Sequence, residues 1–576
     1  MSLRAVFAGA AAAALTACAA GQALATTSVT LYAEASGGSG SSSCQSGQPV
    51  CTLGQAITQA QTLSGDAVTI ELAAGTYASS DYDIDAGTLS SLTLTGAGDT
   101  ATVLDGAGVD IPLETNVSYD VTVESLGLQH GNASASTEGA ELWQRGSGET
   151  TLEHAIVNGG TGASGGGLVE GYDSGGVEVI DSTLENGASI NGVELLGSGE
   201  GSIIGSTLTG FSGSGLGVYT GGTSGVSISD STFTNSNIAI YDYSTGNDDS
   251  GFSTFQGNSD DLVTGSAVSE SMAATSDILA DSCNFAGTAL DDTGYNVGAS
   301  GCVSGVHDRY GLSAGQIGLG SLAANGGPTQ TEAIGSSSQA YDFVPAGDCT
   351  TGTDQRGIGV PQPGASACDS GAYQYGPPTL SYATPASGLP GSSVTLTGTN
   401  LIGVTSVTVD GVAATITAQS DSQITLTIPA VAAGSTSIAA SGPDGAAMTA
   451  FTVSSPAPPP APVLGLSGFA VAKHKGSASV GVSCSDAACS GSLTLTTTKR
   501  KTFERHGHKH HRTVTVKLAS AAYSLSAGQS ATVTLKLDAA GRRDVKRASH
   551  KRPLALTLTA ENAAGTVVST LHPKLT

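Results

Sequence analysis

The sequence is poor in charge and in aromatic rings: charged residues make up 12% of its 576 residues and aromatic residues 5%. Between Thr26 and Pro462 the only lysines and arginines are Arg145, Arg309 and Arg356. A lyase that acts on uronate polymers needs cations facing the substrate carboxylates, so this scarcity argues against that class. The 81 glycines and the few charged side chains favour turn-rich β structure over helices.

Long apolar runs are also missing, except at the N-terminus. Arg4 precedes the apolar run from Ala5 to Ala17, and Ala23 to Ala25 fits a small-residue cleavage site, so residues 1–25 are predicted to be a signal peptide. Leu15 to Cys18 also resembles a bacterial lipobox, which leaves a lipid anchor at Cys18 as the alternative. No later run approaches the about 20 residues that span a bilayer. We therefore expect a secreted or cell-surface protein.

Cysteine usage agrees with export, because an even number of cysteines in an exported chain indicates disulfides. The eight cysteines other than Cys18 form four close pairs in the sequence: Cys44 and Cys51, Cys283 and Cys302, Cys349 and Cys368, and Cys484 and Cys489. Connectivity does not follow from the sequence alone, and nearest-neighbour pairing is the simplest hypothesis. No Cys-x-x-Cys pair occurs, so no metal site is predicted from the cysteines.

The charge is divided unevenly along the chain. Residues 463–576 contain 17 Lys and Arg against 5 Asp and Glu, a net charge of +12. Because the whole chain carries -27, the remainder carries -39. Such a division concerns partners and solubility rather than fold.

A motif with a serine at its centre returns at intervals of 24, 25 and 22 residues, at Ser182, Ser206, Ser231 and Ser253. Its copies read Asp181-Ser-Thr-Leu-Glu-Asn186, Gly205-Ser-Thr-Leu208, Asp230-Ser-Thr-Phe-Thr-Asn235 and Phe252-Ser-Thr-Phe255. A period in this range indicates stacked supersecondary units. The short strands between the copies indicate a parallel β-helix. The asparagines that follow strand runs (Asn158, Asn186, Asn235 and Asn258) are predicted to form left-handed corners.

Motifs at both ends of this region resemble a known family. Cys51 to Leu53, Ala56-Ile57 and Gly75 to Tyr77 form the N-terminal pattern, and Leu53, Ala56, Ile57 and Ala60 have the spacing of a short capping helix. Asn325 to Thr329, Asp354 to Gly357 and Cys368 to Tyr373 form the C-terminal pattern. Residues 26–375 thus resemble bacterial parallel β-helix surface proteins with a choice-of-anchor terminus. The resemblance implies export and a right-handed helix of the pectin-lyase type, and it implies no established chemistry.

Two further domains are predicted after the solenoid. Residues 377–453 contain Gly398 to Leu401, Val407 to Gly411 and Ile428-Pro429, which resemble immunoglobulin-like IPT/TIG domains. Residues 454–462 are a Pro-rich linker, and residues 463–576 read as a basic β-sandwich domain. The predicted fold class is all-β: a right-handed parallel β-helix solenoid followed by two small β-sandwich domains.

Candidates for chemistry are sparse in the solenoid. A glycoside hydrolase needs paired carboxylates, and Asp248 and Asp249 are the adjacent pair that we favour, since they follow an aromatic-rich strand. An acidic loop without catalytic function is the simpler interpretation. No cofactor is predicted, although carboxylates could hold a structural calcium ion in two clusters, formed by Asp81, Asp83 and Asp85 and by Asp260 and Asp261.

The strongest local charge signal is the stretch from Lys499 to Arg512, between two β runs. Its predicted ligand-binding residues are Lys499, Arg500, Lys501, Arg505, His508, Lys509 and Arg512. As a hairpin tip it would bind an anionic wall polymer, a lipid head group or nucleic acid. The alternatives are a transition-metal site on its histidines, or a solvated loop that pairs with the acidic part of the chain. Specific nucleic-acid readout is not expected.

These features predict a non-catalytic protein of adhesive, glycan-binding or structural role at the cell surface. A cell-envelope polymer or glycan is the expected partner, no transmembrane segment is predicted, and a monomer is expected. The alternative is a carbohydrate-active enzyme of the pectin-lyase fold, either a polysaccharide lyase or a glycoside hydrolase.

Overall fold

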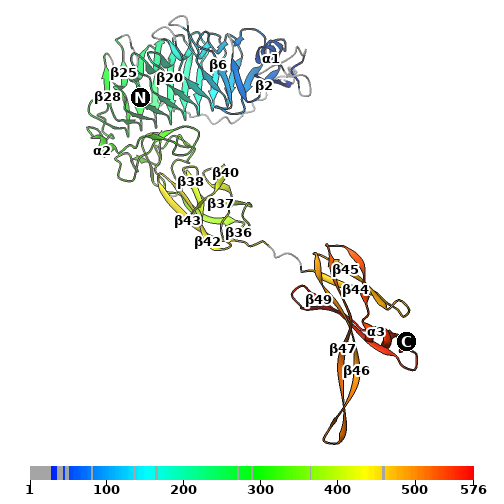
Figure 1. Cartoon of the computed structure of the whole chain (residues 1–576). Coiled ribbons are helices and arrows are strands. Elements are labelled where there is room, and N and C mark those ends of the chain that lie inside the picture. Colours follow the sequence, from blue (N-terminus) through cyan, green and yellow to red (C-terminus); the bar gives the residue numbers. More distant parts are fainter. Residues whose placement is uncertain are drawn as a thin grey trace, which may run out of the picture. The chain divides into compact units, whose positions relative to one another are not determined.

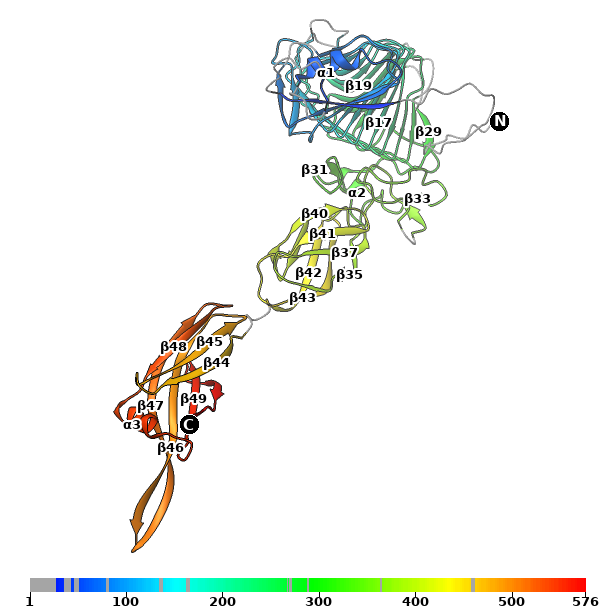
Figure 2. The same ribbon diagram turned by 90° about the vertical axis from the view of Figure 1, so that its right-hand side faces the viewer.

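The computed structural model describes residues 27–35, 43–45, 51–78, 82–133, 138–161, 166–266, 268, 272–286, 290–362, 365–456 and 461–575. The predicted signal peptide with Cys18, Asp81, and residues 457–460 of the linker lie outside this part. The chain forms two compact units, Met1–Ser455 and Pro456–Thr576. Figures 1 and 2 show that the first unit contains a β-solenoid and that the rest of the chain is also β structure.

The solenoid is built from three parallel sheets, and from β2 onward the chain visits them in the same order in every coil. The strands of the first sheet are β1 (Ser28–Ala33), β2 (Ala67–Leu72), β5 (Ser91–Thr95), β8 (Asp120–Glu124), β11 (Thr150–Glu153), β14 (Val177–Ile180), β17 (Glu200–Ile204), β20 (Gly225–Ser229), β23 (Asp249–Gly251), β26 (Ala273–Thr275) and β29 (Asp291–Gly294). The strands of the second sheet are β3 (Gly75–Ala78), β6 (Thr102–Asp105), β9 (Gly127–Gln129), β12 (Ile156–Asn158), β15 (Thr183–Glu185), β18 (Thr207–Thr209), β21 (Thr232–Thr234), β24 (Thr254–Gln256), β27 (Ile278–Leu279) and β30 (Val297–Gly298). The strands of the third sheet are β4 (Tyr82–Ile84), β7 (Leu113–Thr115), β10 (Leu142–Gln144), β13 (Gly167–Gly171), β16 (Asn191–Leu195), β19 (Leu216–Gly222), β22 (Ile238–Ser244), β25 (Asp260–Thr264) and β28 (Ser282–Phe285).

The repeated motif makes the corner between the first and second sheets. The residue before each serine has a left-handed backbone, for example Asp181 (φ 48°) and Asp230 (φ 49°). The apolar residue two positions after the serine is fully buried: Leu184, Leu208, Phe233 and Phe255. The predicted asparagine corners are correct in part, because Asn186 and Asn235 have a positive φ, whereas Asn158 and Asn258 do not.

Each buried serine links two neighbouring coils. The Ser206 hydroxyl oxygen accepts the backbone N–H of Ser182 at 3.1 Å, and the Ser231 hydroxyl oxygen accepts that of Ser206 at 3.1 Å. Ser253 accepts the N–H of Ser231 at 3.2 Å, and Asp277 continues the ladder by accepting the N–H of Ser253 at 2.8 Å. Because all of these atoms are buried, the ladder satisfies amides that no water could reach.

A short helix covers the N-terminal coil, as the apolar spacing predicts. Helix α1 (Leu53–Ala60) begins with a capping box between Thr52 and Gln55, in which each side chain accepts a backbone N–H of the other. Leu53, Ala56, Ile57 and Ala60 are buried against the first coils. The helix therefore hides an apolar end that stacking alone would expose.

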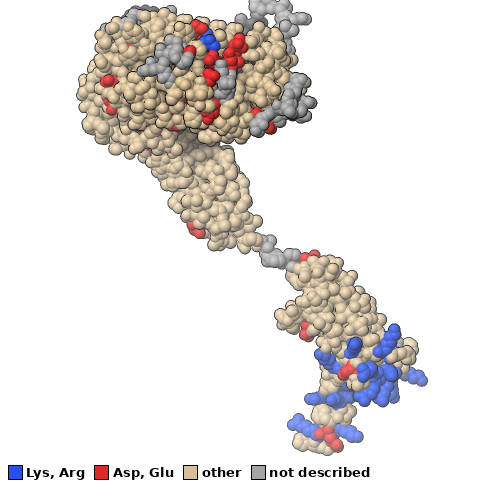
Figure 3. All heavy atoms as spheres, turned by 45° about the horizontal axis from the view of Figure 1, so that its top comes forward, with Lys and Arg blue, Asp and Glu red and all other residues tan. Residues whose placement is uncertain are grey.

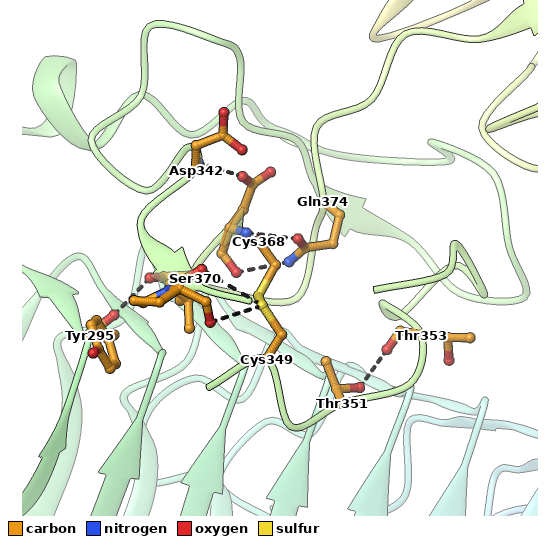
Figure 4. Close-up of a disulfide and its surroundings, with 11 residues drawn as sticks. Tyr295, Asp342, Cys349, Thr351, Thr353, Cys368, Ser370 and Gln374 are labelled. Carbon is orange, nitrogen blue, oxygen red and sulfur yellow. Dashed lines mark hydrogen bonds between the residues drawn. A yellow bond between two sulfur atoms is a disulfide. The ribbon is translucent and has the colours of Figure 1, made fainter. Parts of the chain in front are cut away.

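Residues after Gly301 leave the repeat and pack beside the second sheet. Their short elements are α2 (Ala314–Ile317), β31 (Leu322–Ala323), β32 (Thr331–Glu332), β33 (Val344–Pro345) and β34 (Ala367–Cys368). The Gln355 amide reaches the threonines of the repeat, donating to Thr207 Oγ1 at 3.0 Å and accepting from Thr232 Oγ1 at 2.6 Å. Figure 4 shows the Cys349–Cys368 disulfide beside Ser370, whose hydroxyl donates to the Tyr295 carbonyl at 2.7 Å.

A sandwich of two mostly antiparallel sheets follows in the same unit. The first sheet holds β35 (Thr379–Thr384), β37 (Ser393–Thr399), β41 (Gln423–Thr427) and β40 (Thr415–Gln419). The second holds β36 (Ser387–Gly388), β43 (Gly445–Val453), β42 (Gly434–Gly442), β38 (Ser406–Val409) and β39 (Val412–Ala413). Buried Arg356 joins it to the preceding region, since its guanidinium donates to Asp354 at 2.8 Å and lies 3.7 Å from the Asp444 carboxylate.

The C-terminal unit has its own core of buried residues that includes Val480, Leu493 and Leu558. One sheet holds β44 (Val463–Ala472), β45 (Ser477–Ser485) and β48 (Ser530–Lys536). The other holds β47 (His508–Leu525), β46 (Cys489–Arg505), β49 (Leu554–Asn562), β50 (Val567–Leu571) and β51 (Lys574–Leu575), and α3 (Ala539–Arg547) contacts β47.

The eight cysteines form four nearest-neighbour disulfides: Cys44–Cys51, Cys283–Cys302, Cys349–Cys368 and Cys484–Cys489. Among the described residues, no helix is both long and apolar enough to cross a bilayer.

Candidate functional site

One row of side chains on the outside of the third sheet combines carboxylates and aromatic rings. Parallel pairing aligns Asp83, Glu114, Trp143, Glu170, Glu194, Tyr219 and Tyr241 on successive strands from β4 to β22. The residue before each of the last six is a buried aliphatic that faces the core, such as Leu142 or Val193. Because side chains alternate along a strand, the row points outward. We call these seven residues the outer row.

A groove runs beside the outer row, where the chain turns from the third sheet to the first. Its volume is about 870 Å³, and it is lined by the turns that follow six successive strands, from β4 to β19. The lining residues are Asp85, Ala86, Gly87, Asn116, Val117, Ser118, Arg145, Gly146, Ser147, Tyr172, Asp173, Ser174, Leu196, Gly197, Ser198, Gly222 and Thr223. Strands lie about 4.8 Å apart, so five steps make the groove about 24 Å long, parallel to the solenoid axis.

Glycines allow the turns that line the groove to stack closely on one another. A Cβ atom on Gly146 would lie 2.0 Å from the Val117 carbonyl oxygen of the preceding turn, and one on Gly197 would lie 1.9 Å from that of Asp173. Any larger residue at these positions would push successive turns apart. The glycine and serine content of the turns therefore lets them stack closely enough to form a continuous floor.

Among the described residues that line the groove, Arg145 is the one cation. Its Nη2 donates to Glu114 Oε2 at 2.6 Å, and its Cζ lies 4.1 Å from the centroid of the Trp143 ring. The ring and the carboxylate together hold the guanidinium in one orientation. Two further arginines of the first unit that the structure describes are engaged elsewhere, since Arg309 lies over Phe343 and Arg356 is buried.

Tyrosines line part of the groove and continue the site beyond it. Tyr219 and Tyr241 stack with centroids 5.8 Å apart, and Tyr241 and Tyr243 stack at 6.4 Å. Tyr219 lies next to the groove, because a Cβ atom on Gly221 would lie 3.2 Å from the Tyr219 ring and 3.4 Å from Leu196. Tyr172 and Tyr243 are each 41% exposed. We call Tyr172, Tyr219, Tyr241 and Tyr243 the tyrosine strip.

Two carboxylates of the outer row, Glu170 and Glu194, have raised pKa values. Burial raises the pKa of Glu194 to about 8, and burial together with the charge of Glu194 raises that of Glu170 to about 9. Neither oxygen of Glu170 has a hydrogen-bond partner among the residues that the structure describes. Glu170 is fully buried and is not among the residues that line the groove, so it does not contact a ligand there directly.

The favoured acidic pair does not face a common site. Asp248 is buried, where it accepts the backbone N–H of Val226 at 2.9 Å and the Thr220 hydroxyl at 2.7 Å. Asp249 is the next residue along β23 and lies outside, where it accepts the Ser227 hydroxyl at 3.0 Å. One carboxylate is thus buried and the other exposed, so the two do not line a common surface in this structure.

The calcium candidates are likewise dispersed. Asp261 is buried and already accepts from the Asn258 side chain and the Asp281 backbone, whereas Asp260 accepts from Ser282. Asp83 belongs to the outer row, and Asp85 lines the groove. Within the described ranges, no three His, Cys, Asp or Glu side chains are grouped closely enough to hold a metal ion.

The predicted basic residues do come together, on one long hairpin of the C-terminal unit. Lys499, Arg500, Lys501 and Arg505 lie on β46, and His508, Lys509 and Arg512 lie on β47. Figure 3 shows the blue lysines and arginines gathered on this unit, and red carboxylates gathered on one face of the solenoid.

Comparison with known proteins identifies one domain. Residues 378–455 match the family model of the IPT/TIG domain, so the sandwich after the solenoid is an IPT/TIG domain. None of the curated proteins matches the sequence.

Solved structures show only partial likeness. SGBP-B of a Bacteroides ovatus mixed-linkage glucan utilization locus is 12% identical over 33% of this chain and 52% of its own, with a TM-score of 0.13. SGBP-B from a complex xyloglucan utilization locus in Bacteroides uniformis is 12% identical over 34% of this chain and 70% of its own, with a TM-score of 0.12. A structure with xylogluco-oligosaccharide is 16% identical over 32% and 47%, with a TM-score of 0.14. The chain spans about half the length of the first two structures it matches, and TM-scores this low carry no argument about function.

The sequence-based prediction missed the outer row, although a signal for it exists. Each of its last six members directly follows a buried aliphatic residue, as in Leu142-Trp-Gln144, Val193-Glu-Leu195 and Val218-Tyr-Thr220. These triplets recur once per coil, but no residue type is common to all of them. Only the pairing of strands between coils shows that their central residues form one row.

Proposed function

We propose that this protein is a secreted or cell-surface, non-catalytic glycan-binding protein whose groove and tyrosine strip hold an extended neutral glycan chain. The observation that carries the proposal is the course of the groove across six successive coils, with Tyr172 and Arg145 in its wall. A groove about 24 Å long suits a linear polymer rather than a small molecule.

The chemistry of the walls favours sugars without charge. Aromatic faces pack against the apolar faces of sugar rings, and a few polar groups then fix orientation. Arg145, Asp85, Asn116 and Asp173 supply such donors and acceptors. Because the sequence outside residues 463–576 carries a net charge of -39, a polyanionic glycan would be repelled.

We also propose that residues 26–375 form a right-handed β-helix of the pectin-lyase type with a choice-of-anchor terminus. Support comes from the packing of its C-terminal motifs on one another: Gln355 donates to Thr329 Oγ1 at 2.9 Å, and a Cβ atom on Gly327 would lie 2.5 Å from Arg356 Cα. In this proposal these motifs serve to seal the second sheet, with the IPT/TIG domain following as a spacer.

Affinity electrophoresis of the full chain in gels that contain neutral polysaccharides (a mixed-linkage glucan, a xyloglucan, a xylan or a mannan) tests the proposal. We expect retardation by at least one polymer, and loss of that retardation in Tyr172→Ala and in Tyr243→Ala. Tyr310→Ala is the matched control, because Tyr310 is 55% exposed and lies outside the groove. Retardation that both variants keep would place the binding elsewhere.

The same polymers also test the enzyme alternative. Release of reducing ends, or of unsaturated uronate from polygalacturonate, by the intact protein would contradict the non-catalytic part of the proposal. We expect neither, because both carboxylate oxygens of Asp248 already accept hydrogen bonds inside the coil, from the Val226 N–H and from the Thr220 hydroxyl.

A further inference from the structure

The hairpin of β46 and β47 extends beyond the body of the C-terminal unit. β49 pairs with β46 only as far as Thr497, and the hairpin continues to its turn at His506 and Gly507, both with positive φ. From Arg500 to Thr513 every residue of both strands is exposed. Seven residues of strand at about 3.3 Å each make a ribbon about 23 Å long. We call residues 499–514 the basic ribbon.

The register of the ribbon gives it two chemically different faces. Residues directly opposite one another in an antiparallel pair share a face, and successive pairs alternate. The first face carries the pairs Lys501 with Arg512, Phe503 with His510, and Arg505 with His508. The second face carries the pairs Arg500 with Thr513, Thr502 with His511, and Glu504 with Lys509.

Contacts confirm this division. The Phe503 and His510 rings stack with centroids 5.7 Å apart on the first face, and Phe503 is 43% exposed. On the second face Thr502 Oγ1 and His511 Nδ1 are hydrogen-bonded at 2.9 Å. The ribbon's one acidic residue, Glu504, also lies on the second face. The first face therefore presents cations around an aromatic pair with no carboxylate among them.

The base of the ribbon joins a second basic element. Lys499 forms an ion pair with Asp544 of α3, and the same helix exposes Arg542, Arg543, Lys546 and Arg547. That ion pair uses one lysine and one carboxylate, and it leaves the cations of the first face without an acidic partner within the ribbon. Cations that the fold does not neutralise are available to an anionic partner.

We propose that the first face of the basic ribbon binds a linear phosphate-bearing polymer. Guanidinium forks such as those of Arg505 and Arg512 pair with phosphate oxygens in a bidentate manner, and Lys501 adds a point charge. Successive residues of this face are about 6.6 Å apart, so the cations form a line along the ribbon that suits an extended polyanion. This inference concerns the C-terminal unit and stands independently of the glycan proposal.

The tip argues against insertion into a membrane. Its residues Arg505, His506, Gly507 and His508 are polar or small, and Phe503 is the one exposed large apolar side chain of the ribbon. Peripheral membrane segments instead combine basic residues with an apolar face of several side chains. A polymer that lies along the ribbon would pair its anionic groups with the cations of the first face and leave the charged tip in solvent.

Binding of the full chain to long-chain inorganic polyphosphate, measured by isothermal titration calorimetry at 50 mM and 300 mM salt, tests the proposal. Lys501→Gln/Arg512→Gln should weaken binding at least tenfold, and Phe503→Ala a few-fold. The matched control Arg500→Gln/Lys509→Gln removes the same two charges from the second face and should weaken binding less than threefold. Affinity of the intact protein should fall steeply between the two salt concentrations.

Two further ligands test which class of anion the ribbon binds. Polygalacturonate and vesicles of equal parts phosphatidylglycerol and phosphatidylcholine should each bind at least tenfold more weakly than polyphosphate. Equal losses in the two double variants, or equal binding of polygalacturonate, would overturn the assignment to a phosphate-binding face. Binding of the vesicles without binding of polyphosphate would overturn it in favour of a membrane. Because all the substituted residues lie beyond the core, the variants should keep the thermal unfolding curve of the intact protein.

Discussion

The Arg145 guanidinium lies over the Trp143 indole, with its Cζ 4.1 Å from the ring centroid, and its Nη2 donates a hydrogen bond to Glu114 Oε2 at 2.6 Å. Two residues apart in the sequence, the arginine and the tryptophan project from the same side of the third sheet. The planar cation is thereby held as part of the groove wall, where its remaining N–H groups can meet sugar hydroxyls.

Replacement of Arg145 by lysine should weaken binding of the groove's glycan about five- to tenfold, nearly as much as replacement by alanine. Lysine keeps the charge but has neither the fork nor the flat surface that rests on Trp143. Calorimetric titration of the polysaccharide identified by electrophoresis measures the effect. Arg309→Lys is the control, since Arg309 lies 4.0 Å from the Phe343 ring centroid, outside the groove. An unchanged affinity in Arg145→Lys would mean that charge alone matters.

The serine ladder should matter more to stability than any outward-facing serine. Ser206→Ala would leave the buried N–H of Ser182 without its acceptor, which costs about 1–3 kcal/mol for a buried polar group. The midpoint of urea unfolding, followed by circular dichroism, should fall. Ser202→Ala, on β17 of the same coil and less buried, should leave the midpoint nearly unchanged. Equal shifts would indicate that the ladder adds nothing beyond side-chain volume.

Arg356 should hold the IPT/TIG domain to the region before it. Its guanidinium donates to Asp354 and to the Gln374 carbonyl, and its Cζ lies 3.5 Å from the centroid of the Tyr373 ring. Arg356→Met would leave the buried carboxylates of Asp354 and Asp444 without their cation, a loss of about 3–5 kcal/mol. Limited proteolysis should then cut between the solenoid region and the IPT/TIG domain, and calorimetry should resolve an earlier transition. Cleavage no faster than in the intact protein would argue against this role.

Stability of the first unit should fall as pH rises, the reverse of ordinary acid denaturation. Burial raises the pKa of Glu194 from 4.5 to about 8, so the folded state binds a proton that the unfolded state releases. The free energy of unfolding then decreases between about pH 4.5 and pH 8, and it levels off above the folded pKa. Urea midpoints across this range measure the trend. Glu194→Gln should make the decrease smaller, leaving the part that comes from other buried carboxylates such as Glu170. A midpoint that rises with pH would contradict the assignment.

The solenoid could be predicted from sequence because its corner is local. A left-handed residue, a serine and a buried apolar residue recur together at Asp181 to Leu184 and at Asp230 to Phe233, and each has its physical role within one coil. The short strands between them carry the period-2 pattern. The basic hairpin was also visible, since two β runs bracket Lys499 to His511.

The candidate site could not be predicted, because it depends on register between coils of unequal length. Glu170 and Glu194 are 24 residues apart, whereas Glu114 and Trp143 are 29 apart, and both pairs are direct neighbours across strands. Adjacency in the sequence also made Asp248 and Asp249 a candidate pair, whereas the fold buries Asp248 and exposes Asp249. Likewise, the two faces of the ribbon follow only from the pairing of Arg505 with His508.

The dependence of affinity on oligosaccharide length shows most directly whether the groove holds an extended glycan. Oligosaccharides of increasing length, cut from the polysaccharide that retards the protein, are titrated into the full chain by calorimetry. A groove formed by six coils predicts that affinity rises with each added sugar until the oligosaccharide spans about 24 Å, and then becomes constant. An affinity that is already maximal for a disaccharide, or that is unaffected by Tyr172→Ala, would contradict the claim that the groove holds an extended glycan.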